Sequence, residues 1–318
     1  MALNAGCVSC HSEEAEQWSG SYHQRSDIDP AYRAAFAIEP TAFCRGCHAP
    51  EANPAEDPPR AVSELGVGCV TCHVTREGSV LAAALRNPAE DGAVTAPHPL
   101  HRSTEFAQTG GCAGCHEFPF PMPPSSDDDH FMQTTVREHE RSPAASTACA
   151  ACHMPLVEGR RSHAFAEVRD PAWLKRNLRV TAERMKDSGV RITLVQPAPG
   201  HAFPSGDLFR RLEIGGELRR ADGQVIRREV QYLARHFEAV PGAPGRPLVR
   251  DDRVFAEPSI VELDLSSSAS PPPPRGALLA WWVSCQRVAT VGSGRSPAEA
   301  KVESEIRLHS GVLPWNEN

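Results

Sequence analysis

One five-residue pattern occurs five times in the first half of the chain, and it constrains the fold more than any other feature. The pattern is Cys-x-x-Cys-His, and it accounts for ten of the 11 cysteines. This spacing is the attachment signature of c-type haem, in which two thiols bond to the porphyrin and the adjacent imidazole binds the iron. The predicted thioether cysteines are Cys7, Cys10, Cys44, Cys47, Cys69, Cys72, Cys112, Cys115, Cys149 and Cys152. The predicted proximal iron ligands are His11, His48, His73, His116 and His153.

Two other cysteine chemistries use similar pairs and explain the pattern less well. A zinc ribbon needs two Cys-x-x-Cys pairs per metal ion, so five pairs would leave one unmatched. A disulfide framework gives no reason for a histidine at a fixed offset. At this chain's histidine frequency, five trailing histidines would arise by chance with a probability on the order of 10⁻⁷ under the same spacing rule. The sequence therefore predicts five covalently bound haem c groups.

The motifs follow one another closely along the chain. All five lie between Cys7 and His153, which leaves roughly 30 residues per haem, too few to bury a conventional core. Hydrophobic residues make up 40% of the chain, below the share of about 45–50% usual for globular proteins. We therefore expect the haems themselves to form the core, packed closely enough for electrons to hop between them.

The hydrophobic pattern changes after the last motif and predicts an α+β protein. Residues 1–169 are expected to form a mostly helical and irregular pentahaem domain. A connecting helix is expected over residues 170–189, because Asp170 can cap it and Gly189 can end it. Residues 190–318 alternate apolar and polar side chains, which predicts an antiparallel β-sandwich that serves as a scaffold or docking domain.

The expected strands carry apolar residues at every second position. Asp222-Gly223 lies between two such runs and predicts a hairpin turn. The run Pro271–Pro274 predicts a loop before the apolar stretch Leu278–Val283. The alternating apolar positions are Val190, Ile192 and Leu194, then Leu212 and Ile214, then Val261, Leu263 and Leu265.

Nine further histidines compete for the second axial position of the irons. If every iron has two histidine ligands, five of the nine are distal ligands. His98 is favoured over His101 because the prolines on both sides restrict its backbone. His139 is favoured over His130 because in a helix it would share a face with Met132. The predicted distal ligands are His23, His98, His139, His163 and His201, with His101 and His130 as alternates.

His201 differs from the other candidates because it lies in the expected β domain. Gly and Pro residues frame it in the run Pro199–Gly206, and a loop of this kind presents a side chain to something outside its own domain. We expect His201 to supply one iron ligand and so to dock the two domains.

Several remaining side chains are expected to play lesser or structural parts. Met122 and Met132 are weaker axial candidates than the histidines. His236 and His309 lie in or beside expected strands, which favours structural roles. Cys285 is expected to be a buried apolar thiol in a strand.

The charge balance argues against nucleic acid and an anionic membrane surface as partners. Lys+Arg at 33 against Asp+Glu at 40 gives a net charge of -7, without a basic block for nucleic acid. No apolar run is long enough to span a membrane. Each oxidised bis-histidine haem adds about one negative charge, which takes the total to about -12. We expect other redox proteins with a basic docking face as partners; the sequence permits self-association without arguing for it.

Four sequence runs give the chain a family resemblance. Cys7–His11 is followed by Trp18, Ser21 and His23, similar to a W-x-x-S-x-H segment that ends in a distal histidine. The other three runs are Cys149–Pro155, Ser162–Phe165 and Gly200–Gly206. On these residues the chain resembles multihaem cytochromes c of the superfamily that contains the tetrahaem electron acceptor of hydroxylamine oxidoreductase, here with five motifs and a C-terminal β domain.

The resemblance implies electron transfer in the periplasm or outside the cell. The segment Met1–Asn4 has no signal-peptide character, so we expect the signal peptide to be absent from the numbered chain. The first functional hypothesis is an electron carrier with five six-coordinate irons. The alternatives are a reductase or oxidoreductase of the nitrite or hydroxylamine class with one open iron, and a subunit of a stacked conductive assembly. No motif replaces its histidine by lysine, the mark of one family of nitrite reductases, which favours the carrier.

Overall fold

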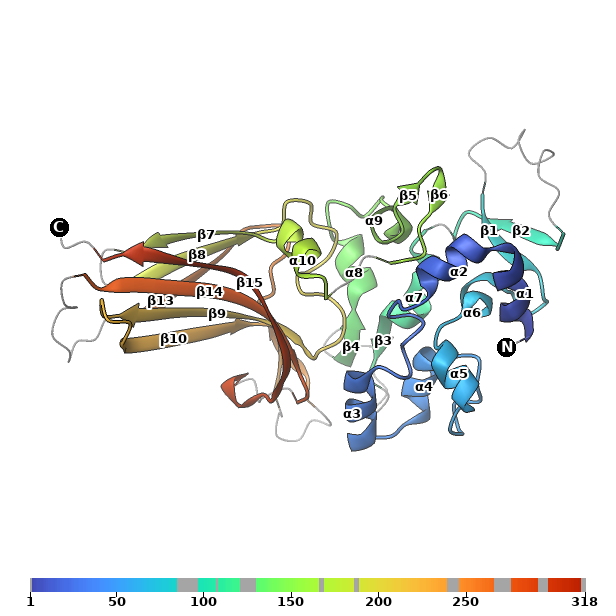
Figure 1. Cartoon of the computed structure of the whole chain (residues 1–318), viewed down its shortest axis with the longest axis horizontal. Helices are drawn as coiled ribbons and strands as arrows, with labels where there is room; N and C mark the ends of the chain where they lie inside the picture. The colour runs from blue at the N-terminus through green and yellow to red at the C-terminus, as the bar shows by residue number, and fades with distance from the viewer. Residues whose placement is uncertain are drawn as a thin grey trace. The chain divides into compact units, whose positions relative to one another are not determined.

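The computed structural model describes most of the chain. The chain separates into two compact units (Figure 1). We call Met1–His116 with Ser146–Glu167 the motif unit, and Glu117–Ala145 with Val168–Asn318 the β unit. The described residues are 2–84, 97–106, 108–120, 130–165, 169–185, 189–238, 246–265, 276–290 and 297–315. Met122 and the proline run Pro271–Pro274 lie outside these ranges.

Short helices are the main regular elements of the motif unit. Four of the five Cys-x-x-Cys-His motifs each lie within one helix. In the first motif the cysteines lie in one helix and His11 is the N-cap of the next. The helices are α1 (Ala2–Cys10), α2 (Ser12–Trp18), α3 (Pro30–Ile38), α4 (Ala42–His48), α5 (Arg60–Leu65), α6 (Cys69–His73), α7 (Gly110–His116) and α9 (Cys149–His153). The strands are β1 (Val80–Ala83), β2 (Leu100–Ser103), β5 (Leu156–Val157) and β6 (Arg160–Arg161).

Local capping explains where two of these helices begin. The Asp29 carboxylate accepts hydrogen bonds from the backbone N–H of Ala31 (3.1 Å) and Tyr32 (3.2 Å), and Pro30 occupies the first turn of α3. The Thr41 hydroxyl accepts from the N–H of Phe43 (3.3 Å) at the start of α4. These caps stabilise helices too short to persist on their own.

The motif unit has almost no core made of amino acids. Among its described residues only two apolar side chains are buried, those of Tyr32 and Ala49. Its buried polar side chains outnumber them and include Asn4, Asp27 and Ser63. So little apolar burial cannot stabilise a unit of this size through amino-acid packing alone.

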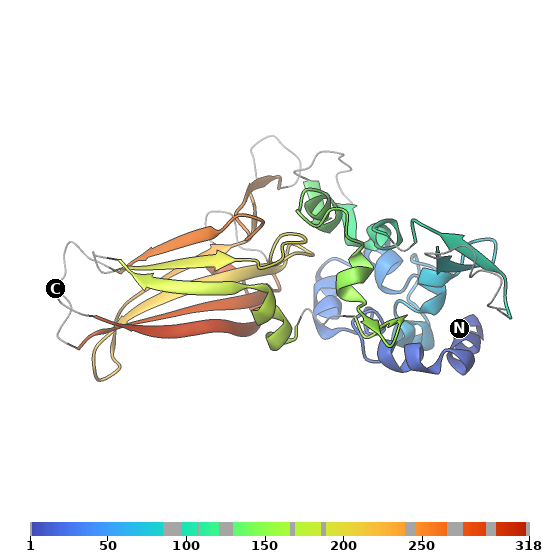
Figure 2. The same ribbon diagram turned by 90° about the horizontal axis from the view of Figure 1, so that it is seen from above.

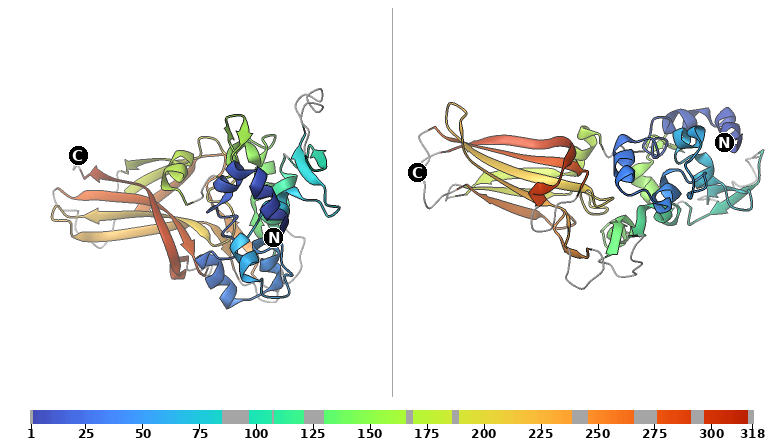
Figure 3. Two further views of the ribbon diagram at one scale, coloured as in Figure 1. Left: turned by 45° about the vertical axis from the view of Figure 1, so that its right-hand side comes forward. Right: turned by 90° about the horizontal axis from the view of Figure 1, so that it is seen from below.

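The β unit contains two antiparallel sheets. One has the strand order β10-β9-β14-β15 and the other β13-β8-β7, and their strands run lengthwise through the unit (Figures 2 and 3). The strands of these sheets are β7 (Arg179–Arg184), β8 (Gly189–Val195), β9 (Arg210–Arg219), β10 (Val225–Leu233), β13 (Ser259–Asp264), β14 (Leu278–Val288) and β15 (Val302–Pro314). The remaining elements are β3 (Glu117–Pro119), β4 (Phe131–Thr134), α8 (Thr135–Glu140), α10 (Pro171–Asn177), β11 (Arg235–Phe237), β12 (Leu248–Asp251) and the 3-10 helix Pro297–Glu299.

One apolar core joins the two sheets, and the two-residue periodicity predicted from the sequence accounts for it. The inward positions alternate with more exposed ones along β8 and β13, as expected for strands with one buried face. The core includes Val190, Ile192, Leu194, Leu212, Ile214, Val261, Leu263 and Val283. The predicted turn at Asp222-Gly223 joins β9 to β10, with Gly223 at a φ of 88°. The α+β class is therefore confirmed.

The predicted helix over residues 170–189 is wrong beyond its first two turns. Its start is as expected, because Asp170 accepts from the N–H of Ala172 (2.8 Å). The helix α10 ends at Asn177, and β7 follows with alternating exposure and antiparallel pairing to β8. Gly189 begins β8 instead of ending a helix. Pairing with a neighbouring strand outweighs the weak helical pattern, as tertiary context commonly does.

The boundary between the units also differs from the predicted one at residue 169. The segment Glu117–Ala145, which precedes the last motif, belongs to the β unit. Arg235 holds it by donating to the carbonyls of Phe131 and Met132, and the distance to the latter is 2.9 Å. Within this segment residues 131–134 pair with β3. The helical face expected to join Met132 to His139 therefore does not form.

No helix among the described residues is long and apolar enough to cross a membrane.

Two positions on β13 test the core of the β unit. Leu263 is fully buried and Ile260 is 62% exposed on the same strand. We expect Leu263→Ala to destabilise the β unit by about 2–5 kcal/mol through lost contacts and a cavity. Ile260→Ala should change the free energy of unfolding by less than about 0.5 kcal/mol. Hydrogen-exchange protection of the β8 and β13 amides measures both, and equal effects would contradict the assigned core.

Candidate haem sites

Three motif histidines each face a second histidine at nearly the same distance. The ring centroids of His11 and His98 are 6.5 Å apart, and those of His73 and His163 are 6.1 Å apart. The rings of the third pair, His23 and His116, are 6.2 Å apart. Their interplanar angles are 43°, 33° and 85° in that order, so none of the pairs is stacked.

This distance fits a metal ion held between two imidazoles. A metal–imidazole bond is about 2.0–2.1 Å long, and a ring nitrogen lies about 1.1 Å from its ring centre, so two rings on opposite sides of one metal have centroids about 6.3 Å apart. Each pair joins one predicted proximal ligand to one predicted distal ligand. The arrangement of these residues therefore fits the axial ligation of a haem iron.

Backbone carbonyls orient several of these rings. Nδ1 lies within hydrogen-bonding distance of Ser26 O in His48 (2.7 Å), of Leu81 O in His73 (3.1 Å) and of Arg161 O in His163 (3.0 Å). An imidazole that donates Nδ1–H to a carbonyl keeps its lone pair on Nε2, the form that binds a metal. Burial also lowers the pKa of His73, which favours the neutral ring.

The segment that carries His23 is held by residues about forty positions later. The N–H of Val67 donates to the carbonyl of His23 (2.8 Å), and the Trp18 indole N–H donates to the carbonyl of Val67 (2.9 Å). Gly66 has a φ of 59° and lies so close that an added Cβ would be 2.5 Å from the His23 carbonyl oxygen. Burial, followed by the influence of His153, lowers the pKa of His23, and its Nδ1 is buried without a hydrogen-bond partner. A buried, unpartnered ring nitrogen is costly unless it binds something.

The two neighbouring candidates His98 and His101 occupy different environments. His98 faces His11 and has a buried Nδ1 without a hydrogen-bond partner. The side chain of His101 is exposed on β2. The structure therefore brings His98, and not the alternate, next to a motif histidine.

Tyr32 is a neighbour of the motif histidines that the sequence did not indicate. Its ring stacks on that of His48, with centroids 3.6 Å apart and planes inclined by 7°. The Tyr32 hydroxyl is buried without a hydrogen-bond partner. A stacked ring holds the imidazole plane in place, and no local pattern in the chain points to the contact, because Tyr32 belongs to α3 and His48 to α4.

The other candidate ligands lie in the β unit. His139 on α8 is 8% exposed, and its Nδ1 lies 2.8 Å from Gly200 O while Nε2 is buried without a hydrogen-bond partner. In His201, Nδ1 lies 2.9 Å from Ala202 O. His130 precedes β4, and its Nδ1 is buried without a hydrogen-bond partner. His139 and His201 therefore share the ligand-type orientation seen in the motif unit.

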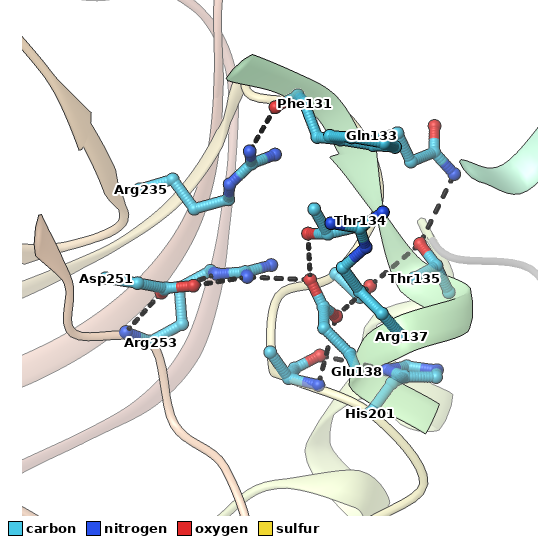
Figure 4. A network of polar contacts seen from close by, with 12 residues as sticks. Phe131, Gln133, Thr134, Thr135, Arg137, Glu138, His201, Arg235, Asp251 and Arg253 are labelled. Atoms are coloured by element: carbon cyan, nitrogen blue, oxygen red, sulfur yellow. Dashed lines mark hydrogen bonds and ion pairs between the residues drawn. The ribbon is translucent and has the colours of Figure 1, made fainter. Parts of the chain in front are cut away.

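A buried network of charged and polar groups surrounds α8 (Figure 4). Glu138 accepts from the Arg253 guanidinium (2.7 Å), the Ser205 hydroxyl (2.6 Å) and the Thr134 hydroxyl (2.7 Å). Arg253 also pairs with Asp251 (2.6 Å). No local pattern in the chain points to this cluster, since Glu138 and Arg253 are 115 positions apart.

The charges in this network balance one another. Burial raises the pKa of Glu138, but Arg253 and the hydroxyl donors outweigh it and hold the pKa below its ordinary value. The pKa of Asp251 is also lowered, because hydrogen bonds and charge from Arg253 exceed the effect of burial. Burial, followed by repulsion from Arg253, lowers the pKa of Arg235 to about 10. Both carboxyls are therefore ionised at neutral pH.

The residues expected to be structural have partners or packing that suit such roles. Nε2 of His236 lies 2.9 Å from Asp252, and Nε2 of His309 lies 2.8 Å from the Leu178 carbonyl. Cys285 packs against the core from β14, and burial raises its pKa to about 11. None of the eleven cysteines, all within the described ranges, forms a disulfide. The described residues contain no cluster of three or more His, Cys, Asp or Glu side chains that could hold a metal ion.

Comparison with known proteins gives a partial family match and a match of fold. Residues 6–74 match the family described as cytochrome c554 and c-prime. A penta-heme cytochrome c552 from Thermochromatium tepidum is 20% identical, with a TM-score of 0.70 over 97% of this chain and 97% of that chain. At this identity the likeness shows a shared fold. No curated protein matches.

A second solved structure is similar over a smaller part of the chain. It is the β-glucuronidase 2 of Bacteroides uniformis, 9% identical over 44% of this chain and 13% of that chain. Its TM-score of 0.19 is too low to carry an argument.

The Glu138 network predicts a pH dependence of the β unit. Because the folded-state pKa of this carboxyl lies below its ordinary value, its stabilising contribution is present above about pH 5 and is lost as the pH falls. Glu138→Gln should lower the urea midpoint at pH 7 and flatten its decline toward pH 3. Hydrogen-exchange protection of the strand amides, followed with increasing urea concentration at each pH, reports the midpoint. The control is Glu262→Gln, at an exposed ion pair with Arg191, in which the urea midpoint should decline with falling pH as in the parent protein. The same parental decline in Glu138→Gln would contradict the assignment.

Proposed function

We propose that this protein is a multihaem c-type cytochrome that binds five haem c groups covalently and passes electrons between redox partners. The observation that carries the proposal is the set of facing histidine pairs. The rings of three motif histidines, His11, His73 and His116, each lie 6.1–6.5 Å, centroid to centroid, from the ring of a second histidine. The partial match to cytochrome c554 and c-prime and the penta-heme neighbour support the same function.

The pairs suggest which histidine serves which iron. We assign His98 to the iron of His11, His23 to that of His116, and His163 to that of His73. For two further irons the candidate distal ligands are His139 and His201, because both direct Nδ1 toward a backbone carbonyl, and His130 is the alternate.

The histidines of this protein would influence the reduction potentials of the haems and keep exogenous ligands away from the irons. Bound haem supplies a one-electron couple at its iron, with a potential that depends on the axial ligands and their surroundings. Nδ1–H donation from His48, His73 and His163 to carbonyls makes each imidazole a stronger donor, which favours the oxidised iron. Filling both axial positions with histidine excludes exogenous ligands, and this suits a carrier better than an enzyme.

The surroundings of such a carrier follow from its charge and cofactor chemistry. We place it in the periplasm or outside the cell, where c-type haem is attached, within the superfamily of the tetrahaem acceptor of hydroxylamine oxidoreductase. The negative net charge of -7, made larger by haem propionates, suits transient docking with a basic redox protein.

The count of attached haems tests the proposal most directly. A pyridine haemochrome assay should find about five c-type haems per chain. In denaturant, a thiol reagent should titrate one cysteine, Cys285, because the other ten are thioethers. Two or fewer haems, or eleven reactive thiols in a haem-loaded preparation, would contradict the proposal.

The ligand assignment makes a second prediction that separates His98 from its neighbour. The parent protein should bind no carbon monoxide when reduced. His98→Ala should create about one carbon monoxide-binding haem per chain, because it vacates one axial position. His101→Ala should bind none, since its side chain is exposed on β2. Stoichiometric binding by the parent would favour an enzyme with an open iron.

A further inference from the structure

Two consecutive residues of α8 hold the backbone on both sides of His201. His139 Nδ1 lies 2.8 Å from the carbonyl of Gly200, and the Glu138 carboxylate accepts from the N–H of Ala202 (3.2 Å). The carbonyl of His201 itself accepts from the Gln196 amide (2.9 Å). Three backbone atoms at and around His201 are therefore fixed by side chains.

The same carboxylate is anchored more deeply in the β unit. The Arg253 guanidinium, 3% exposed along its side chain, binds Glu138 (2.7 Å) and the carbonyl of Pro204 (3.2 Å). The hydroxyl of Ser205 also donates to Glu138 (2.6 Å). Helix α8 and the loop that carries His201 therefore meet at one buried ion pair (Figure 4).

The backbone pairing beyond the loop gives this arrangement a rigid base. Phe203 and Val254 exchange both backbone hydrogen bonds, at 2.7 and 3.1 Å. Gln196, which binds the carbonyl of His201, also donates to the carbonyl of Val254 (3.0 Å). Strand ends, loop and helix thus share a single set of polar contacts, and a buried hydrogen-bonded network of this kind restricts the loop to one geometry.

We infer that Glu138 is a positioning residue that locks His139 and His201 into one two-histidine module, so that the axial ligands of two different irons are set together. This inference rests on the proposed function, because it takes both histidines as iron ligands. Glu138 acts through its contacts with Ala202, Ser205 and Arg253. Its removal is expected to disturb two haems at once, whereas loss of one histidine disturbs one.

The experiment uses the full-length, haem-loaded protein and counts haems that bind carbon monoxide, together with the high-spin signal in EPR. His139→Ala should yield about one such haem per chain. Glu138→Ala should yield about two, or shift the reduction potentials of two haems where both stay low-spin. Ser205→Ala removes one hydrogen bond to the carboxylate without leaving Arg253 unpaired, and should shift the same two potentials by less.

A matched control separates positioning from general destabilisation. Glu213 is a similarly buried carboxylate that accepts from Trp282 (2.8 Å) and Gln286 (2.8 Å). Glu213→Ala should lower the melting temperature and leave all haem signals at parental values. If Glu138→Ala and Ser205→Ala leave the haems unchanged, or alter only the one affected by His139→Ala, the inference is overturned.

The number and spin state of the haems in the parent protein show whether a negative result refutes only the two-histidine module or also the proposed function. A parent with five low-spin haems combined with unaffected Glu138 variants refutes the module alone. A parent without attached haem refutes the proposed function and the module together. If Glu138→Ala does not accumulate, Ser205→Ala and Thr134→Val, which each delete one neutral donor to Glu138, decide the outcome.

Discussion

The geometry of facing imidazoles is the constraint on which the motif unit depends. Its helices are short, and only two of its described apolar side chains are buried, so apolar packing does not determine how they lie. Instead, three pairs of rings from distant parts of the chain meet at 6.1 to 6.5 Å. Carbonyls such as Ser26 O and Leu81 O orient the motif rings. In the proposed function each pair closes on one iron, and metal–ligand bonds then replace the missing core as the source of stability.

The β unit is stabilised by a different and more common interaction. Side chains such as Ile192 and Leu263 are fully buried between two sheets, and their burial accounts for the fold without a cofactor. The buried ion pair of Glu138 and Arg253 carries a desolvation penalty that apolar residues in the same place would not. The neighbouring His139 and His201 explain why such a pair is useful here, because a buried polar network restricts the orientation of nearby side chains more narrowly than apolar contact does.

Sequence reasoning succeeded where the physical signal is local. The alternation at Val190, Ile192 and Leu194 involves neighbours only, and the strands formed as expected. It failed where a distant partner decided the outcome. Residues 179–184 joined a sheet because β8 pairs with them, and Glu117–Ala145 joined the β unit because Arg235 and Arg253 bind it.

The sequence by itself predicts the attachment chemistry, since a thioether pair and its adjacent histidine must be contiguous, and it determined the alternating strands of the β unit. Only the tertiary structure decided which rings face one another. His11 and His98 are 87 positions apart, and no periodicity relates them. It also placed His98 beside His11, while His101 is exposed, and it joined His139 to the loop of His201. The physical reason is that hydrogen bonds and ring contacts depend on distance in space, which chain spacing specifies only over a few residues.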